Sequence, residues 1–134
     1  MKKNIFQLEK KVIFVLDDVE SSLLTAKNAL KDNYRVITFS SAGKLFAFLV
    51  KIKPSLILLD IQMPDINGFQ VLKQLKENKQ NKDIPVIFVT SGGTVANVAK
   101  AAAFGVCDFI VKPYKPEALL EKVESLLAKD TNWR

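Results

Sequence analysis

Residues that could carry phosphoryl or metal chemistry follow four short apolar runs of this sequence. They are Asp17 and Asp18 after the run at 12–16, Asp60 after 56–59, Thr90 and Ser91 after 86–89, and Lys112 after 109–111. Each residue alone has a structural explanation, because Asp, Ser and Thr favour turns and helix caps, and a lysine at a strand end is usually solvated. Their shared position after apolar runs indicates a common site.

Three carboxylates at one site would repel one another and raise each other's pKa unless a cation lies among them. Mg²⁺ is the natural cation, with Mn²⁺ as the alternative, because it prefers carboxylate oxygens completed by water and phosphate oxygens. An Asp can then act as the nucleophile in phosphoryl transfer, while a lysine and a hydroxyl stabilise the phosphoryl oxygens. The chain contains no histidine, which excludes His-ligated metal sites, Ser-His-Asp triads and His general bases.

The apolar runs themselves predict a parallel sheet. There are five, VIFVL, RVITF, LILL, VIFV and FIV, and most are continuous rather than alternating, which is typical of strands covered on both faces. Residues with helical spacing separate them: Leu23, Ala26 and Leu30; Leu45, Phe48, Leu49 and Ile52; Phe69, Leu72 and Leu75; Val95, Val98, Ala99 and Ala102; and Leu119, Val123, Leu126 and Leu127 after Pro116. This alternation predicts a doubly wound α/β fold. If the strand order is 2-1-3-4-5, the three Asp residues come from adjacent strands, and Lys112 needs its full length to reach Asp60.

Composition agrees with one folded domain in the cytoplasm. The 134 residues are 49% hydrophobic and 25% charged. No apolar run approaches the roughly 18 residues of a membrane span, and the first residues lack the apolar segment of a signal peptide. The single cysteine, Cys107, agrees with a reducing compartment and is interpreted as a small buried hydrophobe.

The net charge of +6 raises the question of nucleic-acid binding. The lysines are scattered, however, and neither interleaved aromatic residues nor a DNA-binding motif accompanies them. The main groups are Lys2, Lys3, Lys10 and Lys11, then Lys73, Lys76, Lys79 and Lys82. A solvated surface is therefore favoured over direct contact with nucleic acid.

Four motifs together resemble the receiver domain of two-component response regulators, of which the chemotaxis regulator is the single-domain type. The motifs are VLDD, LLDIQMPDINGFQVL, PVIFVTS and AFGVCDFIVKP. The resemblance covers essentially the whole chain and implies one receiver domain over residues 1–134, with a core at about 10–129 and short tails. It also implies a flavodoxin-like (βα)₅ fold whose parallel sheet has the order 2-1-3-4-5.

The resemblance assigns a role to each candidate residue. Asp60 matches the phosphoacceptor, which takes its phosphoryl group from the phosphohistidine of a histidine kinase or a histidine phosphotransfer protein. Asp17 and Asp18, with Asp60 and the backbone carbonyl of Gln62, would hold Mg²⁺, with Asp17 binding either directly or through a water. The residues implied to bind the phosphoryl group or to switch are Thr90, the backbone N–H of Ser91, Lys112 and Phe109.

Phosphorylation of such a domain is implied to reshape the surface of the fourth helix, fifth strand and fifth helix, which acts on a downstream protein or output domain. Phe109 could otherwise be a simple core aromatic residue. The Lys112–Pro113 bond matches the cis peptide of the family. Gln62 and Gly92 occupy the positions that tune dephosphorylation, but they leave the lifetime of the phosphorylated state open.

Three other interpretations differ in the chemistry that they require. An Asp-nucleophile phosphatase of the haloacid dehalogenase type needs a second Asp two residues after the nucleophile, where this chain has Gln62. A flavin carrier needs a phosphate-binding loop after the first strand, but that loop reads DDVESS. The interpretation as a receiver fold that contacts partners without being phosphorylated stays open. So do the cognate kinase, the downstream target, the oligomeric state, and whether the chain is a complete regulator or part of a longer protein.

Overall fold

A five-stranded parallel sheet lies at the centre of the computed structural model, which describes residues 10–91, 99–100, 102–103, 105–106 and 108–130. The strands are β1 (Val12–Leu16), β2 (Arg35–Phe39), β3 (Leu56–Asp60), β4 (Val86–Thr90) and β5 (Asp108–Val111). Their order is β2-β1-β3-β4-β5, and every neighbouring pair is parallel. The predicted fold class and strand order are confirmed.

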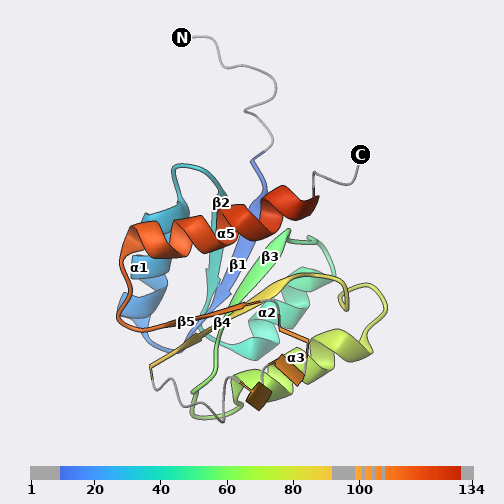
Figure 1. The fold of residues 1–134 in the computed structure, drawn as a ribbon. Helices are drawn as coiled ribbons and strands as arrows, with labels where there is room; N and C mark the ends of the chain where they lie inside the picture. The colour runs from blue at the N-terminus through green and yellow to red at the C-terminus, as the bar shows by residue number, and fades with distance from the viewer. Residues whose placement is uncertain (1–9, 92–98, 101, 104, 107, 131–134) are drawn as a thin grey trace.

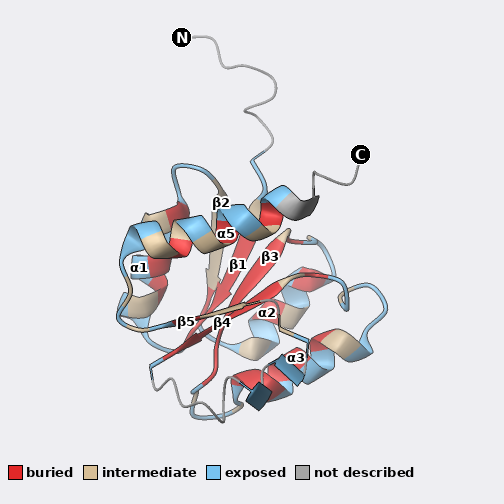
Figure 2. Cartoon of the chain, in the orientation of Figure 1, coloured by how far each residue is buried: buried red, intermediate tan, exposed pale blue. Residues whose placement is uncertain are grey.

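Helices cover both faces of the sheet (Figure 1). The helices α1 (Glu20–Leu30) and α5 (Pro116–Asp130) pack on one face, and α2 (Ala42–Leu49) and α3 (Gly68–Glu77) pack on the other. Each face has its own apolar cluster, and the strands between them are the most deeply buried part of the fold (Figure 2). The continuous apolar runs of the sequence follow from this two-sided burial. Among the described residues, no helix is both long enough and apolar enough to cross a membrane.

Three strands are one residue longer than the sequence predicted: β5 begins at Asp108, and β3 and β4 each end one residue later. Asp60 and Thr90 are the last residues of β3 and β4, rather than the first residues after them. The sheet ladder continues through both positions, because Asp60 pairs with Val89 and Thr90 pairs with Val111. The backbone of the expected phosphoacceptor is therefore held by the sheet, whereas a loop residue would have fewer restraints.

Parts of the predicted helical faces differ in the structure, since Phe48 and Ala99 are exposed and Ile52 lies beyond the end of α2. Phe48 is 41% exposed, because it lies at the margin of the core, where its ring packs edge-on against Phe39 at 5.1 Å between centroids. Most of the predicted fourth helix, including Val95 and Val98, lies outside the described residues, and so does Cys107. Ala99 is helical but exposed.

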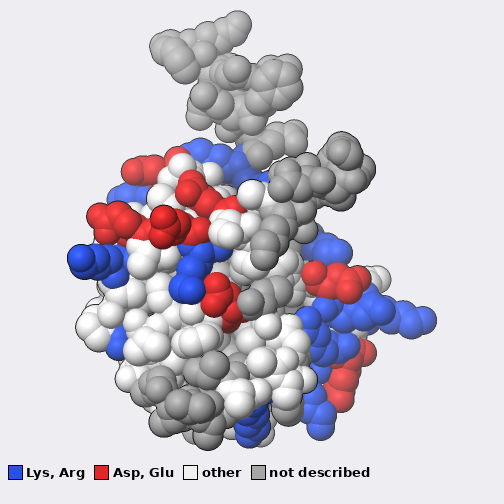
Figure 3. Space-filling view, viewed as in Figure 1, with Lys and Arg blue, Asp and Glu red and all other residues white. Residues whose placement is uncertain are grey.

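Surface charges of both signs are mixed on the face shown in Figure 3. Acidic side chains gather over α5, while basic side chains gather around the end of α3 and the segment that follows it. The exposed lysines of that region are Lys73, Lys79 and Lys82.

Candidate functional site

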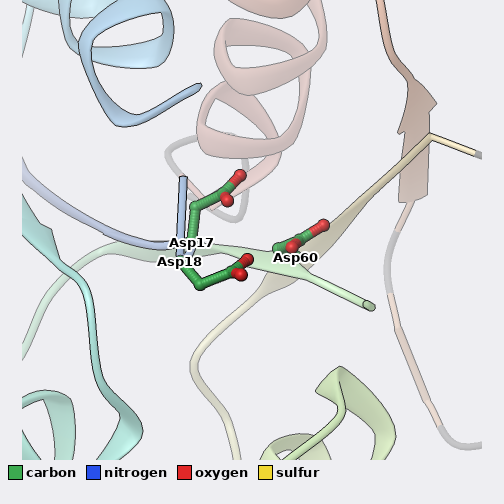
Figure 4. A group of neighbouring side chains, drawn as sticks. All are labelled: Asp17, Asp18 and Asp60. Atoms are coloured by element: carbon green, nitrogen blue, oxygen red, sulfur yellow. The ribbon is translucent and has the colours of Figure 1, made fainter. Parts of the chain in front are cut away.

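Three carboxylates converge at the carboxyl ends of the two central strands. Asp17 and Asp18 follow β1, and Asp60 ends the neighbouring strand β3. Each offers an oxygen within 4.8 Å of the oxygens of the other two, and Figure 4 shows the three side chains beside one another. Asp17 and Asp60 are each only 4% exposed, whereas Asp18 is open to solvent.

The environment of Asp60 makes its charge unfavourable without a cation. Burial, followed by repulsion from the Asp17 carboxylate, raises the pKa of Asp60 from 3.8 to about 6. The Lys112 ammonium and a hydrogen bond from the Gln62 backbone act in the opposite direction, while Asp18 adds a smaller repulsion. A cation placed beside Asp60 would therefore stabilise the charged form of its carboxylate.

The donor set fits Mg²⁺, because all the converging ligand atoms are carboxylate oxygens and one of the three carboxylates is open to water. Asp17, Asp18 and Asp60 would hold the ion. Bound there, it would neutralise the negative charge that otherwise repels a phosphoryl group.

Lys112 reaches this site from the edge of the sheet. Its backbone N–H donates to the carbonyl oxygen of Thr90 at 2.7 Å, and its peptide bond to Pro113 is cis. Its ammonium lies 2.7 Å from Asp17 Oδ2 and 3.7 Å from Asp60 Oδ1. The sequence suggested that Lys112 would need its full length to reach Asp60, but its shorter contact is with Asp17, one strand further away.

Two contacts, one of Asp17 and one of Lys112, were not anticipated from the sequence. The backbone N–H of Val19 donates to Asp17 Oδ1 at 2.9 Å, so both oxygens of this carboxylate have donors. The Lys112 ammonium also donates to Ser22 Oγ at 3.1 Å. The only signal for Ser22 in the sequence is a hydroxyl in the first turn of the helix that follows the acidic pair.

Tyr114 is a further neighbour that the sequence did not indicate. Burial raises the pKa of its phenol to about 12, and the Asp17 carboxylate contributes to the shift. The phenol therefore stays protonated throughout the neutral range, as a neutral group beside the buried acid.

The remaining candidate residues surround the carboxylates. Thr90 ends β4 and is buried at 1% exposure, whereas Ser91 is exposed and its hydroxyl donates to Gln62 Oε1 at 3.1 Å. Phe109 lies half-buried in β5, packed against the apolar cluster on the α2 and α3 face. Gly92 lies outside the described residues.

The beginning of α3 helps to place Asp60. Asn67 and Gln70 form a capping box in which the side chain of each accepts from the backbone N–H of the other. The N–H of Gly68 donates to the carbonyl oxygen of Ile61 at 2.8 Å, which ties the helix to the residue after Asp60. The loop between β3 and α3 is thus anchored at both ends.

Comparison with known proteins gives a consistent result. The family model described as the response regulator receiver domain matches residues 13–124. Over 118 residues the chain is 33% identical to the response regulator protein TodT of Pseudomonas putida, covering 87% of this chain and 51% of TodT. Over 127 residues it is 31% identical to the probable transcriptional regulator ycf27 of Cyanophora paradoxa, covering 94% of this chain and 52% of ycf27. The chain spans about half the length of these relatives.

Solved structures show the same fold. The chemotaxis protein CheY4 of Vibrio cholerae superposes with a TM-score of 0.82 at 25% identity, covering 87% of this chain and 98% of CheY4. A CheY-like receiver domain protein from Methanospirillum hungatei gives 0.82 at 28% identity, covering 90% of this chain and 96% of that chain. Members of the response regulator receiver domain family are signalling phosphoacceptors rather than conventional enzymes. Together with the converging carboxylates and Lys112, these matches show that the chain belongs to this family of two-component signalling.

Proposed function

We propose that this chain accepts a phosphoryl group on Asp60 in a Mg²⁺-dependent reaction. The donor is the phosphohistidine of a histidine kinase or of a histidine phosphotransfer protein. A carboxylate oxygen of Asp60 attacks the phosphorus atom, the phosphorus–nitrogen bond breaks, and the donor histidine leaves with its electron pair and takes up a proton. The observation that carries this proposal is the buried carboxylate of Asp60 beside two further carboxylates and a lysine at one sheet edge.

Each neighbour of Asp60 has a part in this reaction. Because its pKa is about 6, most of Asp60 is ionised and nucleophilic at pH 7.5. Asp17 and Asp18 hold the cation with Asp60 and the backbone carbonyl of Gln62, and Asp17 acts directly or through a water. Lys112 is near enough to move onto the oxygens of a new phosphoryl group.

The same group then changes the surface of the domain. Phosphorylation adds nearly two negative charges and three acceptor oxygens, which the Thr90 hydroxyl, the Ser91 N–H and Lys112 engage. Thr90 pairs with Val111 and Phe88 pairs with Phe109, so a movement at the end of β4 is passed directly to β5. Phe109 then turns inward, and the surface that includes β5 and α5 controls a downstream protein or an output domain. Gln62 and Gly92 tune the loss of the phosphoryl group.

We place this activity in the cytoplasm and in a single receiver unit over residues 1–134, with its core at about 10–129. The family match at 13–124 supports that core. Another similar protein is named as the DNA-binding dual master transcriptional regulator RpaA of Synechocystis, and the chain covers 49% of its length. DNA binding by RpaA is not proposed for this chain. Its proposed partner is a downstream protein or an output domain.

Intact-mass measurement after incubation with acetyl phosphate and Mg²⁺ tests the proposal. One phosphoryl group should be added to the wild type, and chelation of Mg²⁺ should prevent the addition. Asp60→Asn should stay unlabelled, whereas Asp83→Asn, which removes an exposed carboxylate, should be labelled like the wild type.

Three results would contradict the proposal. Equal labelling of wild type and Asp60→Asn would place the phosphoryl group elsewhere. Steady turnover of an aryl phosphate would instead favour a phosphatase. A wild type that is never labelled, yet binds its partner, would favour the phosphorylation-independent interaction module.

A further inference from the structure

We propose that Ser22 is a positioning residue that holds Lys112 away from Asp60 in the resting protein and thereby slows phosphorylation. This inference rests on the proposed function, because the position of Lys112 affects the rate only if a phosphoryl group is transferred to Asp60. It concerns a hydroxyl on α1, outside the carboxylate cluster.

The contacts of the Lys112 ammonium are unequal. It donates to Asp17 Oδ2 at 2.7 Å and to Ser22 Oγ at 3.1 Å, and both distances are those of hydrogen bonds. Asp60 Oδ1 lies at 3.7 Å, which is too far for a hydrogen bond. In the resting protein, two acceptors other than the expected phosphoacceptor therefore hold the ammonium.

The two residues that hold the ammonium belong to other elements than the strand of Asp60. Lys112 follows β5 and Asp60 ends β3, whereas Asp17 follows β1, which lies on the other side of β3 in the sheet. Ser22 lies in the first turn of α1, the helix that follows Asp17 in the chain. To hydrogen-bond Asp60 Oδ1, the ammonium must come roughly 1 Å closer to that oxygen.

The structure distinguishes Ser22 from Asp17 as the restraint. Asp17 belongs to the carboxylate cluster, so a bound cation would repel the Lys112 ammonium and weaken their ion pair. Ser22 is neutral and is not one of the clustered ligands. A bound cation would therefore not compete with the Lys112 ammonium for the Ser22 hydroxyl. The helix fixes this acceptor in place, because the Ser22 N–H donates to the carbonyl oxygen of Val19 at 3.0 Å.

Limited solvent around the ammonium strengthens this restraint. The side chain of Lys112 is 21% exposed and that of Asp17 is 5% exposed. Water therefore replaces a lost hydrogen bond less easily than it would on an open surface. Removing the Ser22 hydroxyl should raise the free energy of the resting position more than that of the transition state, in which Lys112 has moved away.

The rate of phosphorylation by acetyl phosphate at saturating Mg²⁺ is the first test. Ser22→Ala should react about fivefold faster than the wild type, in line with the net contribution of one typical intramolecular hydrogen bond. Ser22→Thr, which keeps a hydroxyl, should react at close to the wild-type rate. Ser21→Ala is the matched control, because it makes the same change at the preceding, exposed residue of the same helix and should leave the rate unchanged.

The second test observes Lys112 itself, in the protein without Mg²⁺ or phosphodonor. The ¹H–¹⁵N signal of the Lys112 ammonium should shift and exchange faster with water in Ser22→Ala, and it should stay unchanged in Ser21→Ala. A purely structural role for Ser22 in α1 would not select this signal.

The outcomes separate the two proposals. If the wild type is labelled but Ser22→Ala reacts no faster than Ser21→Ala, or reacts more slowly, Ser22 does not restrain Lys112 and only this inference is overturned. An unchanged ammonium signal in Ser22→Ala would overturn it as well. If the wild type is never labelled at Asp60, the proposed function fails and this inference fails with it.

Discussion

The Lys112 ammonium occupies a position that a divalent cation would compete for. It lies 2.7 Å from Asp17 and 3.7 Å from Asp60, so it offsets part of the negative charge that would attract Mg²⁺. In Lys112→Met, which keeps most of the aliphatic stem, we expect Mg²⁺ to bind about tenfold more tightly, because a unit charge at this distance contributes kilocalories at a partly buried site. Isothermal titration with Mg²⁺ measures the change.

A lysine on helix α5 provides the control for this titration. Lys122 is paired with Asp108 at 3.2 Å and contacts none of the three clustered carboxylates through any described ion pair. Lys122→Met should bind Mg²⁺ like the wild type. Weaker or unchanged binding by Lys112→Met would mean that the ammonium does not oppose the metal.

At the scale of elements, the junction between β3 and α3 has no room for a side chain at Gly68. A Cβ atom there would lie 2.6 Å from the Asp60 carbonyl oxygen and 2.8 Å from the Ile61 Cα, both of which are backbone atoms that cannot rotate away. Gly68→Ala should therefore reduce the free energy of unfolding by about 1–3 kcal/mol, as overpacking does in cores. It should also displace α3 from the backbone of the expected phosphoacceptor.

Another helical glycine gives the opposite expectation for the same substitution. A Cβ atom at Gly43 in α2 would point into open space, with no neighbouring side chain or strand within 4 Å. Gly43→Ala should therefore increase the free energy of unfolding by about 0.5–1 kcal/mol through lower backbone entropy in the unfolded chain. Urea unfolding of both variants measures the two effects. If Gly68→Ala and Gly43→Ala change the free energy of unfolding by similar amounts, close packing at Gly68 does not determine the effect of its substitution.

The sequence predicted the elements better than the contacts between them. Two-sided burial produces continuous apolar runs, so the strands were visible in the sequence, and the polar residues at their ends identified Asp17, Asp60 and Lys112. The end of a run does not mark the last ladder pair, so Asp60 was predicted one residue outside its strand. The contact of Lys112 with Ser22 depends on how α1 is rotated and on how far a flexible side chain extends, and neither is encoded in residue spacing.

At the scale of the whole molecule, Asp60 makes stability depend on pH. Its folded-state pKa of about 6 lies above the ordinary 3.8, so the folded protein binds this proton more tightly than the unfolded chain does. This contribution to stability is fully present below about pH 4 and is lost as the pH rises through about 6. At pH 7.5 without Mg²⁺, the charged form costs on the order of 2–3 kcal/mol.

Asp60→Asn removes this cost, because the amide is neutral at every pH. In urea unfolding without Mg²⁺, the variant should be more stable than the wild type at pH 7.5, slightly less so at pH 6, and by only about 1 kcal/mol at pH 4.5. Adding Mg²⁺ at pH 7.5 should narrow the difference, since a cation that binds only the folded carboxylate cluster stabilises the wild type. Asp83→Asn, at an exposed carboxylate, should change stability by less than about 0.5 kcal/mol at each pH. If Asp60→Asn increases the free energy of unfolding by the same amount at pH 4.5 and pH 7.5, the charge of the buried carboxylate is not the source of the increase. The fold then does not lose stability by keeping a nucleophile ionised at this edge of the sheet.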